Sequence, residues 1–245
     1  MIQIYIILVG LTISSFIGSI SYRVPGNISI ITPRSFCIHC KKTIKPYDLI
    51  PFLSYIILGG RCRFCKNKIP LKYFVIEIII PLIYIGIYIK FGPGYEFFLL
   101  CYLITVLVYL SLVDFDTGSL GIYDIFSVYI GGFCLLLLSL MGKLRHPPSY
   151  FLYGALSASV LISLSFLIIF LVKRKVPMGA GDLLVIPGPS LYFGVFEVIR
   201  VLIFSSLFGI FVGLALIFTR IVGKGSKFPM IPYITAGVVI EILFF

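Results

Sequence analysis

Four cysteines are spaced in this sequence as the ligands of a metal ion are. They form two C-x-x-C pairs, CIHC and CRFC, separated by 21 residues, and they are Cys37, Cys40, Cys62 and Cys65. Cysteine sets with this spacing bind Zn²⁺ tetrahedrally. Because four thiolates fill the coordination shell and leave no place for water, the expected role of the zinc is structural. The alternative is a reduced set of thiols or two local disulfides.

Two aspartates occupy positions suited to acid–base chemistry, in a chain with only nine acidic residues. Asp114 follows the apolar run LSLV, and Asp182 ends the sequence GAGD behind Gly179 and Gly181. Carboxylates at membrane depth are costly, so they are functional candidates. If the two carboxyls meet, they share one proton: the ionised member can take a proton from water while the protonated member polarises a peptide carbonyl. This is the chemistry of an aspartic protease, which needs neither metal nor histidine.

The other acids have more than one interpretation. The glycines before Asp182 allow its backbone to approach a partner closely, but G-A-G-D alone is also typical of a loop with an acidic helix cap. Asp116 is either the catalytic aspartate in place of Asp114 or a hydrogen-bond acceptor that supports the catalytic pair. Glu77 lies one turn inside an apolar run, where it can pair with Lys72 or bind substrate. Asp124 can cap a helix, and Glu241 has no evident partner.

The composition predicts a membrane protein of the all-α class. Hydrophobic residues make up 60% of the chain and charged residues 12%, and apolar runs of near-spanning length recur throughout. The first run lacks a basic leader and a cleavage site, so we expect a retained span. The sixth run holds Pro187, Gly188 and Pro189, so we expect a kinked or broken helix there. The candidate spans number eight: 2–21, 73–89, 96–113, 123–141, 150–172, 183–197, 201–219 and 229–245.

The basic residues predict the orientation of these spans. Sixteen of the twenty Lys and Arg residues lie in the polar insertion 23–72 or in the connections 173–182 and 220–228. Positive residues stay on the cytoplasmic side, so these segments and the connection 114–122 are expected to face the cytoplasm. A basic inner face suits anionic lipid headgroups, which explains the net charge of +11 without nucleic acid.

The expected organisation has three parts. Residues 1–22 form the first transmembrane helix, residues 23–72 form a cytoplasmic zinc-binding domain with four cysteine ligands, and residues 73–245 form a transmembrane aspartic peptidase core. No internal repeat is evident.

Taken together, these residues resemble the prepilin peptidase family, which are membrane aspartic proteases with a GxGD motif. The stretch 35–77 looks like the cytoplasmic cysteine domain of that family, including the segment DLIPFLSY and the Gly-Gly before CRFC. VDFD resembles the first catalytic motif, in which the first aspartate is catalytic, and this assigns Asp114. GAGD resembles the second motif and assigns Asp182. The chain departs from the family in TGSLGIYD, which lacks the usual proline, and in having Leu184 where a lysine is common.

The resemblance implies a bacterial inner-membrane enzyme with its active site and zinc domain on the cytoplasmic side. Such enzymes cleave the basic leader of type IV prepilins or pseudopilins, and many methylate the new N-terminus with S-adenosylmethionine. The sequence identifies neither the binding site for this cofactor nor the oligomeric state. Because the basic face would repel a basic leader, local acids must receive it, and the candidates are Asp48, Glu77 and Asp116.

Two other function classes remain open at this point. In a cation-coupled transporter, Asp114 and Asp182 would bind the cation, although both are expected at one membrane face rather than at the midplane. In a non-catalytic protein of secretion or pilus assembly, the zinc domain would serve as a docking module.

Overall fold

The computed structural model describes residues 1–173, 184–219 and 229–245, and it divides into two compact units, Met1–Lys90 and Phe91–Phe245. Over these ranges the chain is helical and forms no strand beyond two isolated bridges. Six helices in the described ranges are long and apolar enough to cross a bilayer. The protein is therefore an all-α, multi-pass membrane protein with a cysteine-containing insertion after its first helix, as the sequence predicted.

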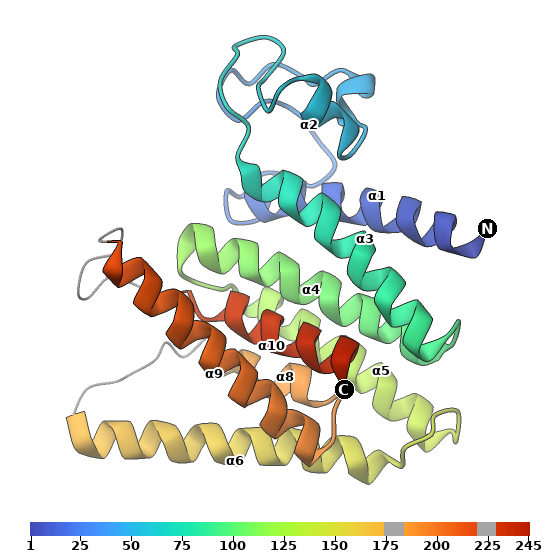
Figure 1. Ribbon diagram of the computed structural model, residues 1–245, viewed down its shortest axis with the longest axis vertical. Coiled ribbons are helices and arrows are strands. Elements are labelled where there is room, and N and C mark those ends of the chain that lie inside the picture. The colour runs from blue at the N-terminus through green and yellow to red at the C-terminus, as the bar shows by residue number, and fades with distance from the viewer. Residues whose placement is uncertain (174–183, 220–228) are drawn as a thin grey trace. The chain divides into compact units, whose positions relative to one another are not determined.

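The first unit consists of two long helices and the insertion between them. The long helices are α1 (Ile2–Arg23) and α3 (Leu71–Phe91), and the insertion contains a short 3-10 helix, η1 (Pro46–Leu49), and α2 (Leu53–Ile57) (Figure 1). The long helices approach closely where α1 has small residues. A Cβ added to Gly10 would lie 2.8 Å from the Cα of Pro81, and one added to Gly18 would lie 3.0 Å from the Tyr73 ring. Small residues spaced along one helix face are typical of packing inside a bilayer.

The second unit is a bundle built around α4 (Tyr95–Thr117). The other helices are α5 (Ile122–Leu140), α6 (Pro148–Lys173), the short α8 (Pro187–Ser190), α9 (Val195–Phe218) and α10 (Ile231–Phe244). Figure 1 shows α10 between α4 and α9. The core includes Leu103, Ile104, Leu107 and Leu110 of α4, all of which are fully buried. Because α5 and α10 pack against it, α4 is the natural support for a polar site in this unit.

The predicted sixth span is broken, as its prolines indicated. Residues 184–194 form only short helical turns, of which α8 is four residues long, and a continuous helix starts at Val195. Glycines on the neighbouring helices make room for this segment: a Cβ at Gly132 of α5 would lie 2.7 Å from the Leu191 side chain, and Gly154 of α6 lies directly against the Phe193 carbonyl. The predicted eighth span is also shorter than expected, because α10 has 14 residues.

The close approach of α1 and α3 generates a prediction about stability. Replacing Gly10 with leucine drives a side chain into the Pro81 backbone and should lower the free energy of unfolding by roughly 1–3 kcal/mol, the usual cost of overpacking. The measurement is thermal unfolding of the purified protein in detergent. Val9→Leu is the matched control, because the Val9 side chain is half exposed on the neighbouring position; equal melting temperatures for the two variants would contradict the prediction.

Candidate functional site

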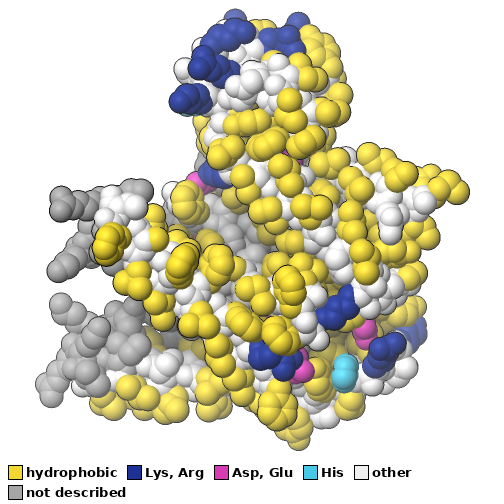
Figure 2. All heavy atoms as spheres, in the orientation of Figure 1, with side chains coloured by type: hydrophobic (Ala, Val, Ile, Leu, Met, Phe, Trp, Pro, Cys, Tyr) yellow, Lys and Arg dark blue, Asp and Glu magenta, His cyan; other side chains and the backbone are white. Residues whose placement is uncertain are grey.

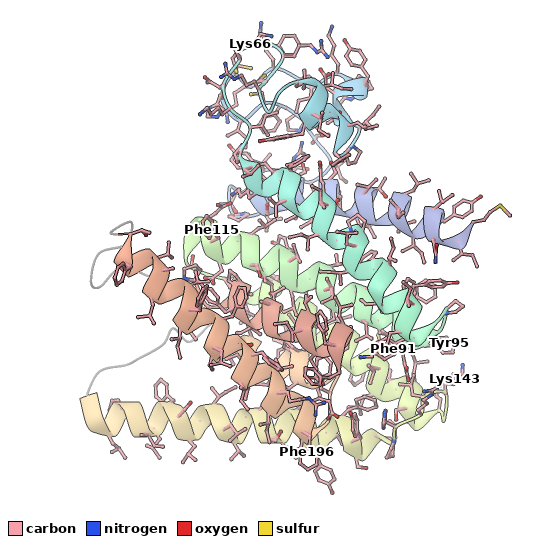
Figure 3. All side chains as sticks on the ribbon, viewed as in Figure 1. Lys66, Phe91, Tyr95, Phe115, Lys143 and Phe196 are labelled. Atoms are coloured by element: carbon pink, nitrogen blue, oxygen red, sulfur yellow. The ribbon has the colours of Figure 1, made fainter. Side chains whose placement is uncertain are left out.

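The four cysteines lie on two hairpin turns that repeat the same hydrogen bonds. In the first turn, Cys37 N–H donates to Lys42 O and Lys41 N–H donates to Cys37 O. In the second, Cys62 N–H donates to Asn67 O and Lys66 N–H donates to Cys62 O. Lys41 and Lys66 both adopt a φ of 58°, and Figure 3 labels Lys66 in the insertion. The segments 35–44 and 60–69 therefore share one backbone design.

The two turns bring the four sulfurs together in a metal-binding arrangement. All four Sγ atoms lie within 4.8 Å of one another, and Cys37 Sγ is 3.8 Å from Cys65 Sγ. Four sulfurs placed about 2.3 Å from one tetrahedral ion are roughly 3.8 Å apart, so the spacing fits a single metal ion. None of these cysteines forms a disulfide. The cluster can therefore bind a metal, and its four cysteines are free thiols rather than two disulfides.

The environment of the cluster favours at least one thiolate near neutral pH. Burial opposes ionisation of Cys62, but the backbone amides of Cys65 and Phe64 and the neighbouring thiols outweigh it and lower its pKa to about 7. The backbone amide of Asn67 lowers the pKa of Cys65, but burial and the neighbouring thiols outweigh this effect and raise the pKa of Cys65 to about 11. Thiolates rather than thiols are metal ligands, so a bound cation would stabilise the charge that this arrangement concentrates.

The insertion is fixed to the start of α3 by Glu77. Its Oε2 accepts a hydrogen bond of 2.7 Å from the amide of Phe52, the residue before α2. The rings of Phe52 and Tyr55 both stack on the ring of Phe74, with centroid distances of 5.5 and 4.6 Å. Glu77 therefore joins a membrane-length helix to the insertion, a contact that the sequence did not predict.

Asp48 is also engaged within the insertion. Its carboxylate accepts two hydrogen bonds from Arg63, 2.7 Å to Nε and 2.6 Å to Nη2, and its side chain is only 5% exposed. The Arg63 guanidinium holds the pKa of Asp48 below its usual range. This pair joins η1 to the second cysteine turn.

A cavity of about 230 Å³ lies in the first unit beside the cysteine cluster. Cys37 and Cys62 line one part of it, and Tyr22, Tyr73 and Glu77 from α1 and α3 line another. Arg23 at its edge is buried, and its guanidinium donates to the carbonyls of Ser29, Ile30 and Pro33. The cavity has space for one nucleoside-sized group, with aromatic faces and a carboxylate as contacts.

In the second unit, Asp114 is held against the start of α10. The residue is 6% exposed, and its Oδ2 accepts a 3.1 Å hydrogen bond from the amide of Ile231, the first residue of α10. A second contact joins α4 and α10 about one turn away from Asp114, where Ser111 Oγ and Thr235 Oγ1 lie 2.8 Å apart. Because a helix N-terminus attracts negative charge, the carboxylate is both oriented and stabilised there.

The Asp114 end of the bundle is distinct from the opposite end. Figure 3 labels Phe115, the neighbour of Asp114, at one end of α4, and Tyr95 with Lys143 at the other. Figure 1 shows that the described ends of α6 and α9, where the chain enters 174–183 and 220–228, lie at the Asp114 end. Asp116 is exposed two residues after Asp114. Asp182, Gly179 and Gly181 lie outside the described residues.

Two further acids have structural partners. Asp124 caps α5 as expected, since its Oδ2 accepts a 3.0 Å hydrogen bond from Gly121 N–H and its Oδ1 accepts one of 2.7 Å from Tyr109. Glu241, which had no evident partner in the sequence, accepts bonds of 2.9 and 2.6 Å from Arg200 of α9. No local signal pointed to this pair, because 41 residues separate its members.

Comparison with known proteins shows which family the chain belongs to. Residues 8–91 match the family model described as the Bacterial Peptidase A24 N-terminal domain. The prepilin leader peptidase/N-methyltransferase of Vibrio cholerae is 31% identical over 191 residues, which are 74% of this chain and 74% of that protein. The chain belongs to the prepilin leader peptidase/N-methyltransferase family.

Other members of the prepilin leader peptidase/N-methyltransferase family align over more of the chain. The Bacillus subtilis member is 27% identical over 237 residues, which cover 96% of this chain and 91% of that protein. The Myxococcus xanthus member is 28% identical over 87% of this chain, which spans 63% of that longer protein. No solved structure matches the chain.

The Asp48–Arg63 pair generates a pH-dependent prediction. Because the native pKa of Asp48 is lowered, its stabilising contribution is complete above the pKa of an unpaired aspartate, about 4, and is lost as the pH falls through the native pKa. Asp48→Asn should therefore lower the melting temperature at pH 7, and the difference from the parent protein should close on acidification below pH ~4. Thermal unfolding across pH measures this. Asp116→Asn is the control, and a pH-independent effect of Asp48→Asn would contradict the prediction.

Proposed function

We propose that the protein is a membrane aspartic endopeptidase that removes the basic leader of type IV prepilins or pseudopilins and methylates the new N-terminus. Asp114 and Asp182 are its catalytic pair in this proposal. The observation that supports it best is the buried Asp114 carboxylate, held at a helix end by the amide of Ile231, in a chain of the prepilin leader peptidase/N-methyltransferase family.

The two carboxyl groups divide the work of hydrolysis. The ionised carboxylate takes a proton from a water molecule, whose oxygen attacks the scissile carbonyl, while the protonated carboxyl donates its proton to the carbonyl oxygen. The tetrahedral intermediate then collapses as its C–N bond breaks and the nitrogen takes up a proton. The contact with α10 keeps the Asp114 oxygens in one orientation throughout, so no reorganisation is needed as charge develops.

Asp182 belongs to the same end of the second unit in this proposal. Leu184, two residues later, is described, and its carbonyl accepts a 2.5 Å hydrogen bond from Tyr129 of α5. Gly179 and Gly181 allow the backbone before Asp182 to approach a partner or a substrate strand. Asp116, which is exposed beside Asp114, is proposed to support the pair and to attract a basic leader.

Glu77 and Asp48 contribute differently from what the sequence suggested. As substrate-binding acids they would need free carboxylate oxygens, but each is engaged, Glu77 by the Phe52 amide and Asp48 by Arg63. We propose that they shape the surface that receives the leader rather than contact its charges.

The metal of the cysteine cluster is proposed to be structural Zn²⁺, bound by Cys37, Cys40, Cys62 and Cys65. The sulfur spacing fits a tetrahedral ion, and a short insertion whose large apolar residues are exposed or only partly buried gains stability from such a bond. S-adenosylmethionine is proposed as the methyl donor. The cavity beside the cluster fits its nucleoside in size, and Tyr22 and Tyr73 on its walls offer aromatic faces to it.

The protein is proposed to lie in the bacterial inner membrane with the insertion and Asp114 on the cytoplasmic side, because the basic connections favour this orientation. The transporter alternative is less favoured, since Asp114 lies in the last turn of α4 and not at the middle of a span. A non-catalytic docking protein would not require a buried carboxylate, so the burial of Asp114 does not favour that alternative.

The catalytic pair is tested by conservative substitution. Asp114→Asn and Asp182→Asn should each abolish leader cleavage, at least about a hundred-fold, because an amide can neither take up nor release the proton at neutral pH. Mass spectrometry of a prepilin after incubation with the purified protein reports the cut and any added methyl group together.

Asp116→Asn is the matched control for this experiment and should keep measurable cleavage. Zinc content and thermal unfolding must stay unchanged in all three variants. Cleavage that survives in Asp114→Asn would exclude the proposed pair, and a cut product without added methyl would limit the proposal to proteolysis.

The zinc proposal is tested by metal analysis. The purified protein should contain one zinc per chain, and Cys37→Ser should remove most of it and make the insertion more sensitive to proteolysis, because three ligands hold a structural zinc poorly. Cys134→Ser is the control, since Cys134 is exposed on α5 and belongs to no cluster among the described residues. A stable, metal-free parent protein would disprove the structural role, and rapid loss of cleavage with a chelator would indicate a metalloprotease.

A further inference from the structure

The insertion exposes an apolar surface on its short helical segment. Within residues 47–57, six large apolar side chains are between 37% and 76% exposed. We call these six residues the 47–57 patch; they are Tyr47, Leu49, Ile50, Leu53, Ile56 and Ile57. Apolar neighbours gathered in this way on a polar domain mark a surface that meets a partner or a membrane.

The edge of the 47–57 patch has the composition of a bilayer boundary. Lys45 and Arg63 lie over the Tyr47 ring, 5.6 and 5.2 Å from its centroid. The only acid between Arg23 and Lys72 is Asp48, and its charge is neutralised by Arg63. Tyrosine and basic side chains are the residues that gather at the level of lipid headgroups. The patch therefore combines an apolar centre with Lys45 and a charge-neutral Asp48–Arg63 pair at its edge, and it has no free negative charge.

The polar groups beneath the patch are paired inside the protein. The hydroxyl of Ser54 lies 2.6 Å from Ile50 O and 3.3 Å from Tyr47 O, and the Ser54 amide donates to Ile50 O at 3.0 Å. The amide that precedes α2 is bound by Glu77. Each of these pairings lowers the cost of moving the segment into an apolar medium, because the paired group has no hydrogen bond to water to lose.

The position of the patch in the first unit indicates what covers it. Its α2 is fixed by Glu77 and Phe74 to the first two turns of α3. On the same helix, Leu71, Val75 and Ile79 are exposed at a spacing of four residues, as on the lipid-facing side of a span. The 47–57 patch is thus at the level where a membrane-spanning helix enters the bilayer.

The charges of the insertion are distributed in agreement with this position. Figure 2 shows its Lys and Arg side chains gathered over the outer end of the insertion, and hydrophobic side chains over the part nearer to the long helices. The insertion is connected to membrane-length helices at both ends, by α1 and by α3. Its apolar part therefore cannot move far from the bilayer.

We propose that the 47–57 patch inserts into the boundary between lipid headgroups and acyl chains, with Lys45 meeting anionic headgroups. Binding of this kind combines buried apolar area with attraction to anionic lipid. The insertion then lies on the bilayer surface, and the cysteine cluster and its cavity are held beside the membrane. This inference depends on the membrane-spanning helices and not on the proposed catalysis.

The chain contains no tryptophan, so a single introduced tryptophan reports its own surroundings. Ile57→Trp places the probe at the most exposed patch position, and Phe64→Trp places it on the second cysteine turn, where Phe64 is 41% exposed under Lys42. Both full-length variants are reconstituted in vesicles of phosphatidylcholine and phosphatidylglycerol, with or without bromine on the acyl chains. Bromine should quench the fluorescence of Ile57→Trp by roughly two-fold or more and that of Phe64→Trp far less, while aqueous acrylamide should quench Phe64→Trp more strongly.

Two results would overturn the inference. Strong quenching of the Ile57→Trp variant by acrylamide without quenching by bromine would place the patch in water. Protection of the same variant from both quenchers would show that protein covers the patch, either another part of this chain or a second copy. Zinc content and thermal unfolding establish that each variant is folded. If the Ile57→Trp variant is not folded, the same quenching comparison is made with Ile56→Trp, because both residues belong to the 47–57 patch.

Discussion

Lipid offers no hydrogen-bond partner to a buried polar group, and this constraint organises both units of the protein. In the second unit the carboxylate of Asp114 meets the amide of Ile231, and Glu241 meets Arg200. In the first unit the guanidinium of Arg23 is surrounded by three backbone carbonyls. Each contact neutralises or hydrogen-bonds a charge with groups that other helices or turns hold in place. The polar groups therefore specify where helix ends meet, while the apolar surfaces only specify that the helices pack.

The contact between Asp114 and α10 connects this constraint to the proposed chemistry. A buried carboxylate is expensive unless it is hydrogen-bonded, and the start of a helix supplies free amides and a favourable dipole at the same time. The Ser111–Thr235 contact one turn further in fixes α4 and α10 against each other. Structural stability and the orientation of a reactive oxygen thus depend on the same helix pair.

The insertion is stabilised by a different set of interactions, because it is too small for a large core. Two repeated turns bring four thiols together, Arg63 joins Asp48 across the insertion, and Glu77 attaches the whole to α3. Its large apolar side chains are exposed or only partly buried. A domain with few buried contacts and many exposed apolar groups can gain stability from a bound metal and from its surroundings, and this insertion lies between two spanning helices.

The sequence by itself determined the features whose signals are local. The spacing of Cys37, Cys40, Cys62 and Cys65, the apolar runs, the break at Pro187 and Pro189, and the cap at Asp124 were all predicted because each depends on residues close together in the chain. The tertiary structure alone decided the partners of the buried charges. Glu241 lies 41 residues from Arg200, and Asp114 lies 117 residues from Ile231, whose contribution is a backbone amide that every residue except proline has. A donor common to nearly all residues leaves no pattern in a sequence, so only the folded chain identifies it.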